Sequence, residues 1–149
     1  MNIEEELKTS KFQSETHKAH LNVLFSASWL KNRVNTTLKP FDLTSEQFNV
    51  IRIVRGKHPE GVRVKDIRSR MLERSSNTTR IIDRLVDKGL LVREKTIQDG
   101  RERAILLTAD GQSLLLEIDA HWIINNPHES VLTPEEADTL SHLLDKMRN

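Results

Sequence analysis

The chain contains no cysteine, few aromatic residues and no long apolar run, and each absence excludes a class of protein. Without cysteine in 149 residues, a disulfide framework, a thiolate zinc site and a cysteine redox switch are all excluded. Aromatic residues make up 4% of the chain and charged residues 30%, a balance that favours a helical protein with many ion pairs over a β-sandwich. No apolar run approaches the roughly 20 residues of a membrane span, and the acidic segment 1–6 does not resemble a signal peptide. We therefore expect a cytoplasmic protein with no membrane partner.

Motifs for catalysis and for metal binding are missing as well. The sequence has no glycine-rich phosphate loop, no His-Glu-x-x-His and no nucleophile elbow. His17 and His20 lie three positions apart on a predicted helix, but two ligands are too few for a zinc site and the spacing offers no third. The sequence therefore predicts no enzyme, no catalytic residue, no cofactor and no metal site.

The net charge of +1 conceals an uneven distribution along the chain. Segment 62–103 contains twelve Lys and Arg residues against seven Asp and Glu, a net charge of +5, and the rest of the chain carries −4. A basic segment between acidic ones suits a protein that docks on DNA, because neutralised phosphates supply most of the non-specific affinity. Basic helical surfaces are also common elsewhere, so charge alone is weak evidence. The length allows one domain, 1–149, with a sizeable core.

Segment 75–89 predicts a helix with one apolar face and one basic face. Two serines, Ser75 and Ser76, precede it as candidate N-caps, and Gly89 is placed to end it. Its apolar residues recur at a helical spacing and would face the core: Ile82, Leu85 and Val86. The opposite face would then carry Asn77, Arg80 and Arg84. Amide and guanidinium groups in one row suit base edges and phosphates, so this segment predicts a DNA-reading helix.

The residues on either side of this helix complete a winged helix-turn-helix. Segment 64–71 predicts a short first helix that leaves Arg68 for solvent or phosphates. Segments 90–95 and 103–107 predict two strands, and the Asp99–Gly100 pair between them is a strong hairpin signal. Arg101 lies near the tip of this predicted wing, where a guanidinium can enter a narrow minor groove. We expect Asp99 and Arg103 to support the wing; the alternative for Arg101 is a solubilising charge on a loop.

These residues resemble the MarR family of bacterial transcriptional regulators. The resemblance extends without a gap over about 35 residues and is carried by Thr79-Arg80, Asp83-Arg84-Leu85, Lys88-Gly89-Leu90, Arg93, Asp99-Gly100-Arg101 and Leu107-Thr108-Ala109-Asp110-Gly111. It implies a mainly α fold: a winged helix-turn-helix with a β-hairpin wing in residues 62–108, flanked by N- and C-terminal dimerisation helices. The predicted DNA-binding residues are Arg68, Ser76, Asn77, Arg80, Arg84 and Arg101.

The flanking segments predict long amphipathic helices. Apolar residues recur every three or four positions between Val23 and Leu38 in a helix expected over 12–38, and again between Leu140 and Met147. Capping signatures at Thr44 and Thr133 predict two further helix starts. In the resembled family the first and last helices intertwine, so we expect 7–39 and 109–149 to dimerise the chain. Packing within one chain is the alternative.

The resemblance also implies a small aromatic or phenolic effector bound between the dimer arms and the reading module. Candidate pocket residues are His20, Trp29, Phe41 and Phe48, although core packing is the ordinary role of such aromatics. The sequence as a whole predicts a homodimeric, sequence-specific repressor that binds a pseudo-palindromic duplex and is released by a ligand. The alternative is a winged-helix module that binds protein and not DNA.

Overall fold

The protein is mainly helical, with one small antiparallel sheet. The computed structural model describes residues 2–74, 77–95, 103–124 and 131–149. Its elements are, in order, α1 (Ile3–Leu7), α2 (Glu15–Leu38), the 3₁₀ turn η1 (Lys39–Phe41), α3 (Ser45–Arg55), β1 (Val62–Arg63), α4 (Val64–Arg70), α5 (Thr78–Asp87), β2 (Leu91–Lys95), β3 (Arg103–Leu107), α6 (Ala109–Ile124) and α7 (Pro134–Arg148). This order and fold class confirm the expected winged helix-turn-helix fold. None of the helices in these ranges combines the length and apolarity of a membrane span.

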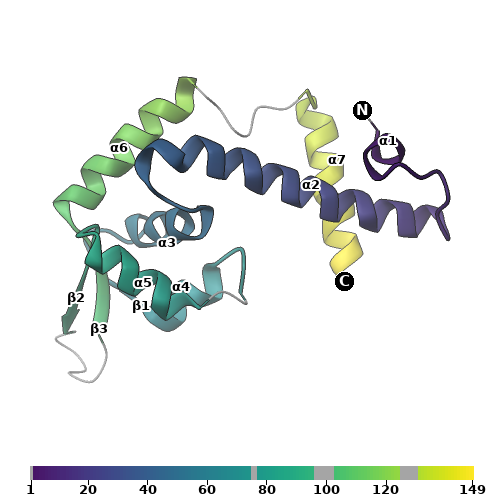
Figure 1. The fold of residues 1–149 in the computed structure, drawn as a ribbon. Helices are drawn as coiled ribbons and strands as arrows, with labels where there is room; N and C mark the ends of the chain where they lie inside the picture. The colour runs from purple at the N-terminus through teal and green to yellow at the C-terminus, as the bar shows by residue number, and fades with distance from the viewer. Residues whose placement is uncertain (1, 75–76, 96–102, 125–130) are drawn as a thin grey trace.

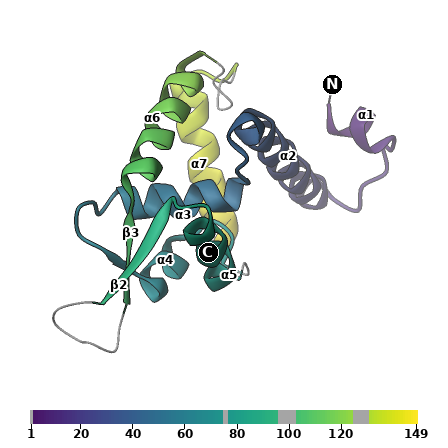
Figure 2. The ribbon, with the colours of Figure 1, turned by 60° about the vertical axis from the view of Figure 1, so that its left-hand side comes forward.

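Helix α3 lies between the long helices α2 and α6 on one side and α4 and α5 on the other (Figures 1 and 2). Helix α2 extends from this centre well beyond the small helices, toward the N-terminus (Figure 1). The three strands are ordered β1-β3-β2, and Leu91 pairs with Leu107 while Lys95 pairs with Arg103. This hairpin register confirms the strands expected on either side of the wing.

Side-chain caps fix where most helices begin. The Thr44 hydroxyl accepts from the backbone N–H of Gln47, whose side chain accepts from the Thr44 N–H in return, and Thr133 and Glu136 form the same reciprocal pair. Both predicted capping boxes are therefore confirmed. Helix α2 begins at Glu15, three residues later than expected, because Ser14 caps it by accepting from the His17 N–H.

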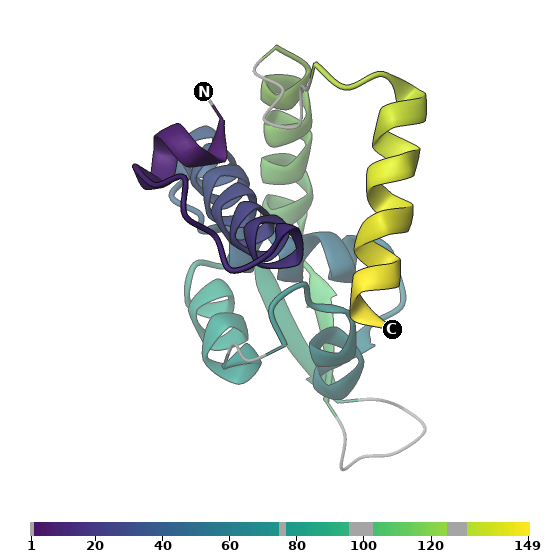
Figure 3. The ribbon, with the colours of Figure 1, turned by 90° about the vertical axis from the view of Figure 1, so that its right-hand side faces the viewer.

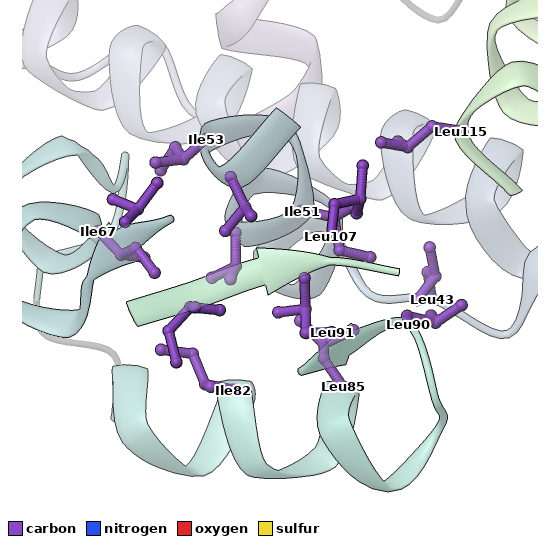
Figure 4. Close-up of a cluster of buried hydrophobic side chains, with 14 of the residues drawn as sticks. Leu43, Ile51, Ile53, Ile67, Ile82, Leu85, Leu90, Leu91, Leu107 and Leu115 are labelled. Atoms are coloured by element: carbon purple, nitrogen blue, oxygen red, sulfur yellow. The ribbon is translucent and has the colours of Figure 1, made fainter. Parts of the chain in front are cut away.

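The core forms where α3, α5 and the sheet meet. Ile82 and Leu85 of α5 point toward the sheet, close to Leu91 (Figure 4), and Ile51 of α3 belongs to the same buried cluster. These four side chains are 0–2% exposed, and burying a Leu or Ile completely contributes about 1.5–3 kcal/mol. The apolar face of α5 predicted from the sequence is therefore the face that packs.

The step from β3 into α6 depends on a close approach at Gly111. The Thr108 hydroxyl donates to the Gly89 carbonyl oxygen at 2.7 Å and accepts from the Gly111 N–H at 3.0 Å, so it caps the start of α6. A Cβ on Gly111 would lie 2.3 Å from the Leu90 carbonyl oxygen. Only glycine fits there, which gives the Leu-Thr-x-x-Gly pattern a steric reason.

We expect Gly111→Ala to lower the free energy of unfolding by about 1–3 kcal/mol, because the added methyl meets backbone and not a flexible side-chain end. Urea denaturation followed by circular dichroism measures this loss. Gly56→Ala is the matched control, since its Cβ would lie 3.5 Å from its nearest neighbour, and we expect it to change stability by less than about 1 kcal/mol. Equal midpoints for the two variants would contradict the steric argument.

The helices outside this core leave large apolar side chains exposed. Helix α7, which stands along one side of the molecule (Figure 3), has no buried residue. Its exposed apolar residues are Leu140, Leu143 and Met147, and similar exposure is found at Leu24 and Leu30 of α2 and at Leu116, Ile123 and Ile124 of α6. Exposure on this scale marks an interaction surface.

Candidate nucleic-acid interface

Packing of α5 determines which of its side chains reach solvent. Because Ile82 and Leu85 are buried, Asn77, Arg80 and Arg84 lie on the outer surface, where all three are exposed. Thr78 lies on the inner side instead, and its hydroxyl is 3.3 Å from the Met71 sulfur. The row of polar groups predicted from the sequence is therefore present on one exposed face.

The N-cap of α5 is Asn77, and the prediction that a serine caps this helix is wrong. The Asn77 side-chain oxygen accepts from the Arg80 N–H at 3.2 Å, and α5 begins at the next residue, Thr78. Asparagine is as good a cap as serine, so the sequence offered three adjacent candidates. Since the oxygen of Asn77 is used by the helix, its amide NH₂ group is the part left to donate to a group outside the helix.

Two ion pairs hold α5 in place at its sides. Asp83 accepts from the Arg93 guanidinium, which ties the helix to β2. Lys88 donates to the Asp42 carboxylate at 2.6 Å, which ties the end of the helix to the turn before α3. Partly exposed pairs of this kind contribute about 0–1 kcal/mol each. Their main effect is therefore on the orientation of the exposed face.

The other predicted DNA-binding residues are distributed around α5. Arg68 is exposed on α4, and Arg84 lines a surface cleft of about 650 Å³ with Lys39 and Lys88 at the far end of α5. Arg103 is the exposed first residue of β3, opposite Lys95. Three further predicted residues lie outside the described residues: Ser76, Asp99 and Arg101.

A second feature of this region is a cavity of about 870 Å³, open on one side, that is lined by α2, α3, α6 and the segment after α4. Its large apolar lining residues are Leu30, Val34, Phe48, Met71, Leu72 and Trp122. The rings of Phe48 and Trp122 stack with their centres 4.6 Å apart. The size suits a small organic ligand, because pockets for such ligands are typically about 300–1,000 Å³.

Of the four predicted pocket residues, Phe48 lines this cavity. Phe41 packs edge-on against His121 with the ring centres 5.3 Å apart. Trp29 is 48% exposed beneath the Arg33 guanidinium, and His20 is exposed on α2. The tryptophan that lines the cavity is Trp122 and not Trp29. Trp122 lies 74 positions after Phe48, so a helical spacing pattern could not predict that the two rings meet.

The charged residues in this lining and beside it could not be predicted from the sequence either. Lys31 of α2 bonds both Glu46 of α3 and Glu73 of the segment between α4 and α5. Two arginines of α3, Arg52 and Arg55, bond Asp119 of α6. These contacts join residues up to 67 positions apart, so no local pattern could reveal them. Among the residues that the structure describes, no three His, Asp or Glu side chains gather as a metal site.

The exposed face of α5 with its two arginines, the buried side chains opposite and the hairpin that follows define a winged helix-turn-helix DNA-binding protein. A family model described as the MarR family matches residues 41–102. A MarR transcription factor from Planctomyces limnophilus is 30% identical, with 93% of this chain and 98% of that chain covered and a TM-score of 0.66. The chain therefore belongs to the MarR family of transcription regulators.

Other solved structures share the fold. A MarR variant from E. coli in complex with operator DNA is 24% identical, with 93% of this chain and 99% of that chain covered and a TM-score of 0.80. BpsR from Bordetella bronchiseptica, described as a protein whose DNA binding is regulated by 6-hydroxynicotinic acid, is 23% identical, with 88% and 98% covered and a TM-score of 0.70.

The double use of Asn77 yields a test. We expect Asn77→Ala to lower the free energy of unfolding by about 1 kcal/mol through loss of the cap, and Asn77→Ser to preserve it. Chemical denaturation measures both. Because Asn77→Ser keeps the cap, any loss of operator affinity in this variant reports the missing amide NH₂ group. If Asn77→Ala were as stable as the wild type, the cap would contribute nothing to stability.

Proposed function

We propose that this MarR-family protein is a homodimeric repressor that reads a pseudo-palindromic duplex and is released by a small molecule. The observation that carries the proposal is the exposed row of Asn77 and Arg80 on a helix whose opposite face buries Ile82 and Leu85 completely. A reading helix must present its side chains from a rigid support, and α5 does so. We expect the protein in the cytoplasm, where its duplex would be.

In this proposal α5 enters the major groove, with Arg80 and the amide of Asn77 directed at base edges. Arg68 and Arg84 contact phosphates on either side, which positions the helix without reading sequence. Ser76 adds a contact before the helix, and Arg101 enters the minor groove from the wing, supported by Asp99 and Arg103. The operator complex of the E. coli MarR variant supports DNA as the partner.

The proposed dimer would cover apolar surface that the single chain leaves exposed to solvent. One winged module buries too little surface for tight specific binding, whereas two modules related by a two-fold axis read two half-sites. The exposed apolar residues of α6 and α7, together with those of α2, support a second copy as the cover. Segments 7–39 and 109–149 are therefore our candidates for the dimer contact.

The cavity beside Phe48 and Trp122 is our candidate site for a small aromatic effector. It touches α2, which belongs to the proposed dimer arm, and Leu72, which lies in the segment before the reading helix. A ligand bound there can change DNA affinity only as far as it prefers the arrangement that does not fit the operator. The regulation of BpsR by 6-hydroxynicotinic acid supports such a role in a protein of this fold.

For the reading helix, we expect Arg80→Ala to weaken binding to a selected operator duplex by about 1–3 kcal/mol. The operator is first selected from a random duplex library, and binding is then measured by fluorescence anisotropy. Lys65→Ala, an exposed charge on α4, is the comparison for a general loss of positive charge. A loss at Arg80 no larger than that at Lys65 would overturn the assignment of Arg80 as a reading residue.

For the wing, we expect Arg101→Ala to weaken specific and scrambled duplexes alike, because an arginine in the minor groove reads mainly shape and charge. The same anisotropy titration at moderate salt measures both. Unchanged affinity for both duplexes would remove the wing from the interface.

For the dimer, we expect Leu143→Glu in α7 to convert the protein to a monomer and to weaken operator binding at least tenfold. Leu143 is 59% exposed in the single chain, so the monomer tolerates the charge, whereas a buried apolar interface does not. Sedimentation velocity gives the oligomeric state. His142→Glu, one residue earlier and on another face of α7, is the control; a dimer that survives Leu143→Glu would place the contact elsewhere.

A further inference from the structure

The wall of the cavity contains a group of three charged residues, Lys31, Glu46 and Glu73, called here the Lys31 cluster. The Lys31 ammonium lies 2.7 Å from a Glu46 carboxylate oxygen and 2.6 Å from a Glu73 carboxylate oxygen. The three side chains come from α2, from the first turn of α3 and from the segment that joins α4 to α5. Because one ammonium serves two carboxylates, the cluster carries one net negative charge.

Contacts within the cluster favour the charged forms of Lys31 and Glu46. A hydrogen bond to Glu46 and, to a smaller extent, one to Glu73 raise the pKa of the Lys31 ammonium. Burial raises the pKa of Glu46, but Lys31, a backbone N–H and the Thr44 hydroxyl together outweigh burial, so that the pKa of Glu46 is lowered. A ligand that enters the cavity therefore meets an ion pair and not neutral side chains.

The other charges of the lining lie at the α6 end of the cavity. Arg52 donates to Asp119 at 3.0 Å, and its guanidinium is 5.8 Å from the centre of the Phe48 ring. Arg55, which is not part of the lining, donates to the same Asp119 at 2.6 Å. Glu46 and Arg52 are six residues apart on α3, which is about 9 Å along the helix axis. The lining itself thus presents two cations and three carboxylates, with the excess carboxylate in the Lys31 cluster.

We propose that the cavity binds an aromatic molecule with a cationic amine, whose ammonium displaces that of Lys31 from Glu73. The aromatic ring of the ligand would lie against the stacked pair of Phe48 and Trp122. These aromatic side chains attract both the apolar ring of the ligand and an ammonium group next to it. This inference rests on the proposed function, in which the cavity is the effector site. It specifies the charge of the effector, which the family resemblance left open.

The same contact gives the ligand a route to the reading helix. Glu73 lies four residues before Asn77, the cap of α5. Next to it, the Leu72 N–H donates to the Asn49 side-chain oxygen of α3 at 3.1 Å, so the segment before α5 is held from α3 at Leu72 and from α2 at Glu73. An ammonium that replaces Lys31 at Glu73 removes the link from α2. The effector then biases the position of α5 relative to the proposed dimer arm.

The charge preference is tested with three probes that share one aromatic body. Isothermal titration of the full chain compares 2-naphthylmethylammonium, 2-naphthalenemethanol and 2-naphthoate. We expect the ammonium to bind about three- to fivefold more tightly than the alcohol, the size of effect typical of partly exposed ion pairs, and the naphthoate to bind most weakly. Glu46→Gln and Glu73→Gln should each reduce the preference for the ammonium.

Equal binding of the three probes, or tightest binding of naphthoate, would overturn the cationic class while leaving an effector cavity in place. No binding of any probe at millimolar concentration would overturn both the cationic class and the effector cavity. Operator binding by the same preparation is measured beside it, so failure of the ligand site is distinguished from failure of DNA recognition.

The link to α5 is tested by two variants of equal charge without ligand. Glu73→Gln and Glu46→Gln each remove one carboxylate from Lys31, but only Glu73 belongs to the segment before α5. We expect Glu73→Gln to weaken operator binding about threefold and Glu46→Gln to leave it unchanged. Loss of a negative charge by itself favours DNA binding, so a weakening cannot come from charge alone.

Lys31→Gln breaks the same link from α2 and should weaken operator binding in the same way. Thermal unfolding confirms that all three variants are folded. Equal operator affinity of wild type, Glu73→Gln and Lys31→Gln would overturn the link.

Discussion

The burial of Ile82 and Leu85 against the sheet is the contact on which the rest of the interface depends. Both side chains are fully buried, and together they fix the rotation of α5 about its own axis. Once that rotation is set, Asn77 and Arg80 must face outward, because helical geometry leaves them no other side. The proposed base-reading surface is thus a consequence of apolar packing, and the ion pair of Asp83 with Arg93 only refines it.

Helix α3 connects this proposed reading surface to the rest of the molecule. On one side it contributes Ile51 to the core beneath α5. On the other side it contributes Phe48 and Glu46 to the cavity shared with α2 and α6. A single rigid helix therefore contacts both the reading module and the proposed effector site, and Asn49 extends this contact to the segment before α5. Coupling between the two sites needs no long pathway in such an arrangement.

Local chemistry made much of the fold predictable from sequence. The capping boxes at Thr44 and Thr133, the two strands of the hairpin and the inward face of α5 follow from residues that lie close together in the sequence. The cap of α5 was assigned to the wrong residue because Ser75, Ser76 and Asn77 are all good caps in succession. Of the aromatic side chains that line the cavity, only Phe48 could be predicted from the sequence, because Trp122 stacks on it from the distant helix α6. The Lys31 cluster likewise joins α2 to a segment 42 residues later. Contacts of that range depend on how the helices pack, which periodicity does not encode.

The measurement that tests the central claim most directly is a salt titration of duplex binding. Fluorescence anisotropy would compare the duplex upstream of the protein's own gene with a scrambled duplex of equal length. Selective binding to the first, with the logarithm of the binding constant falling steeply against the logarithm of salt concentration, is the result predicted for a basic, sequence-reading dimer. Absence of binding to either duplex at low salt would contradict the account.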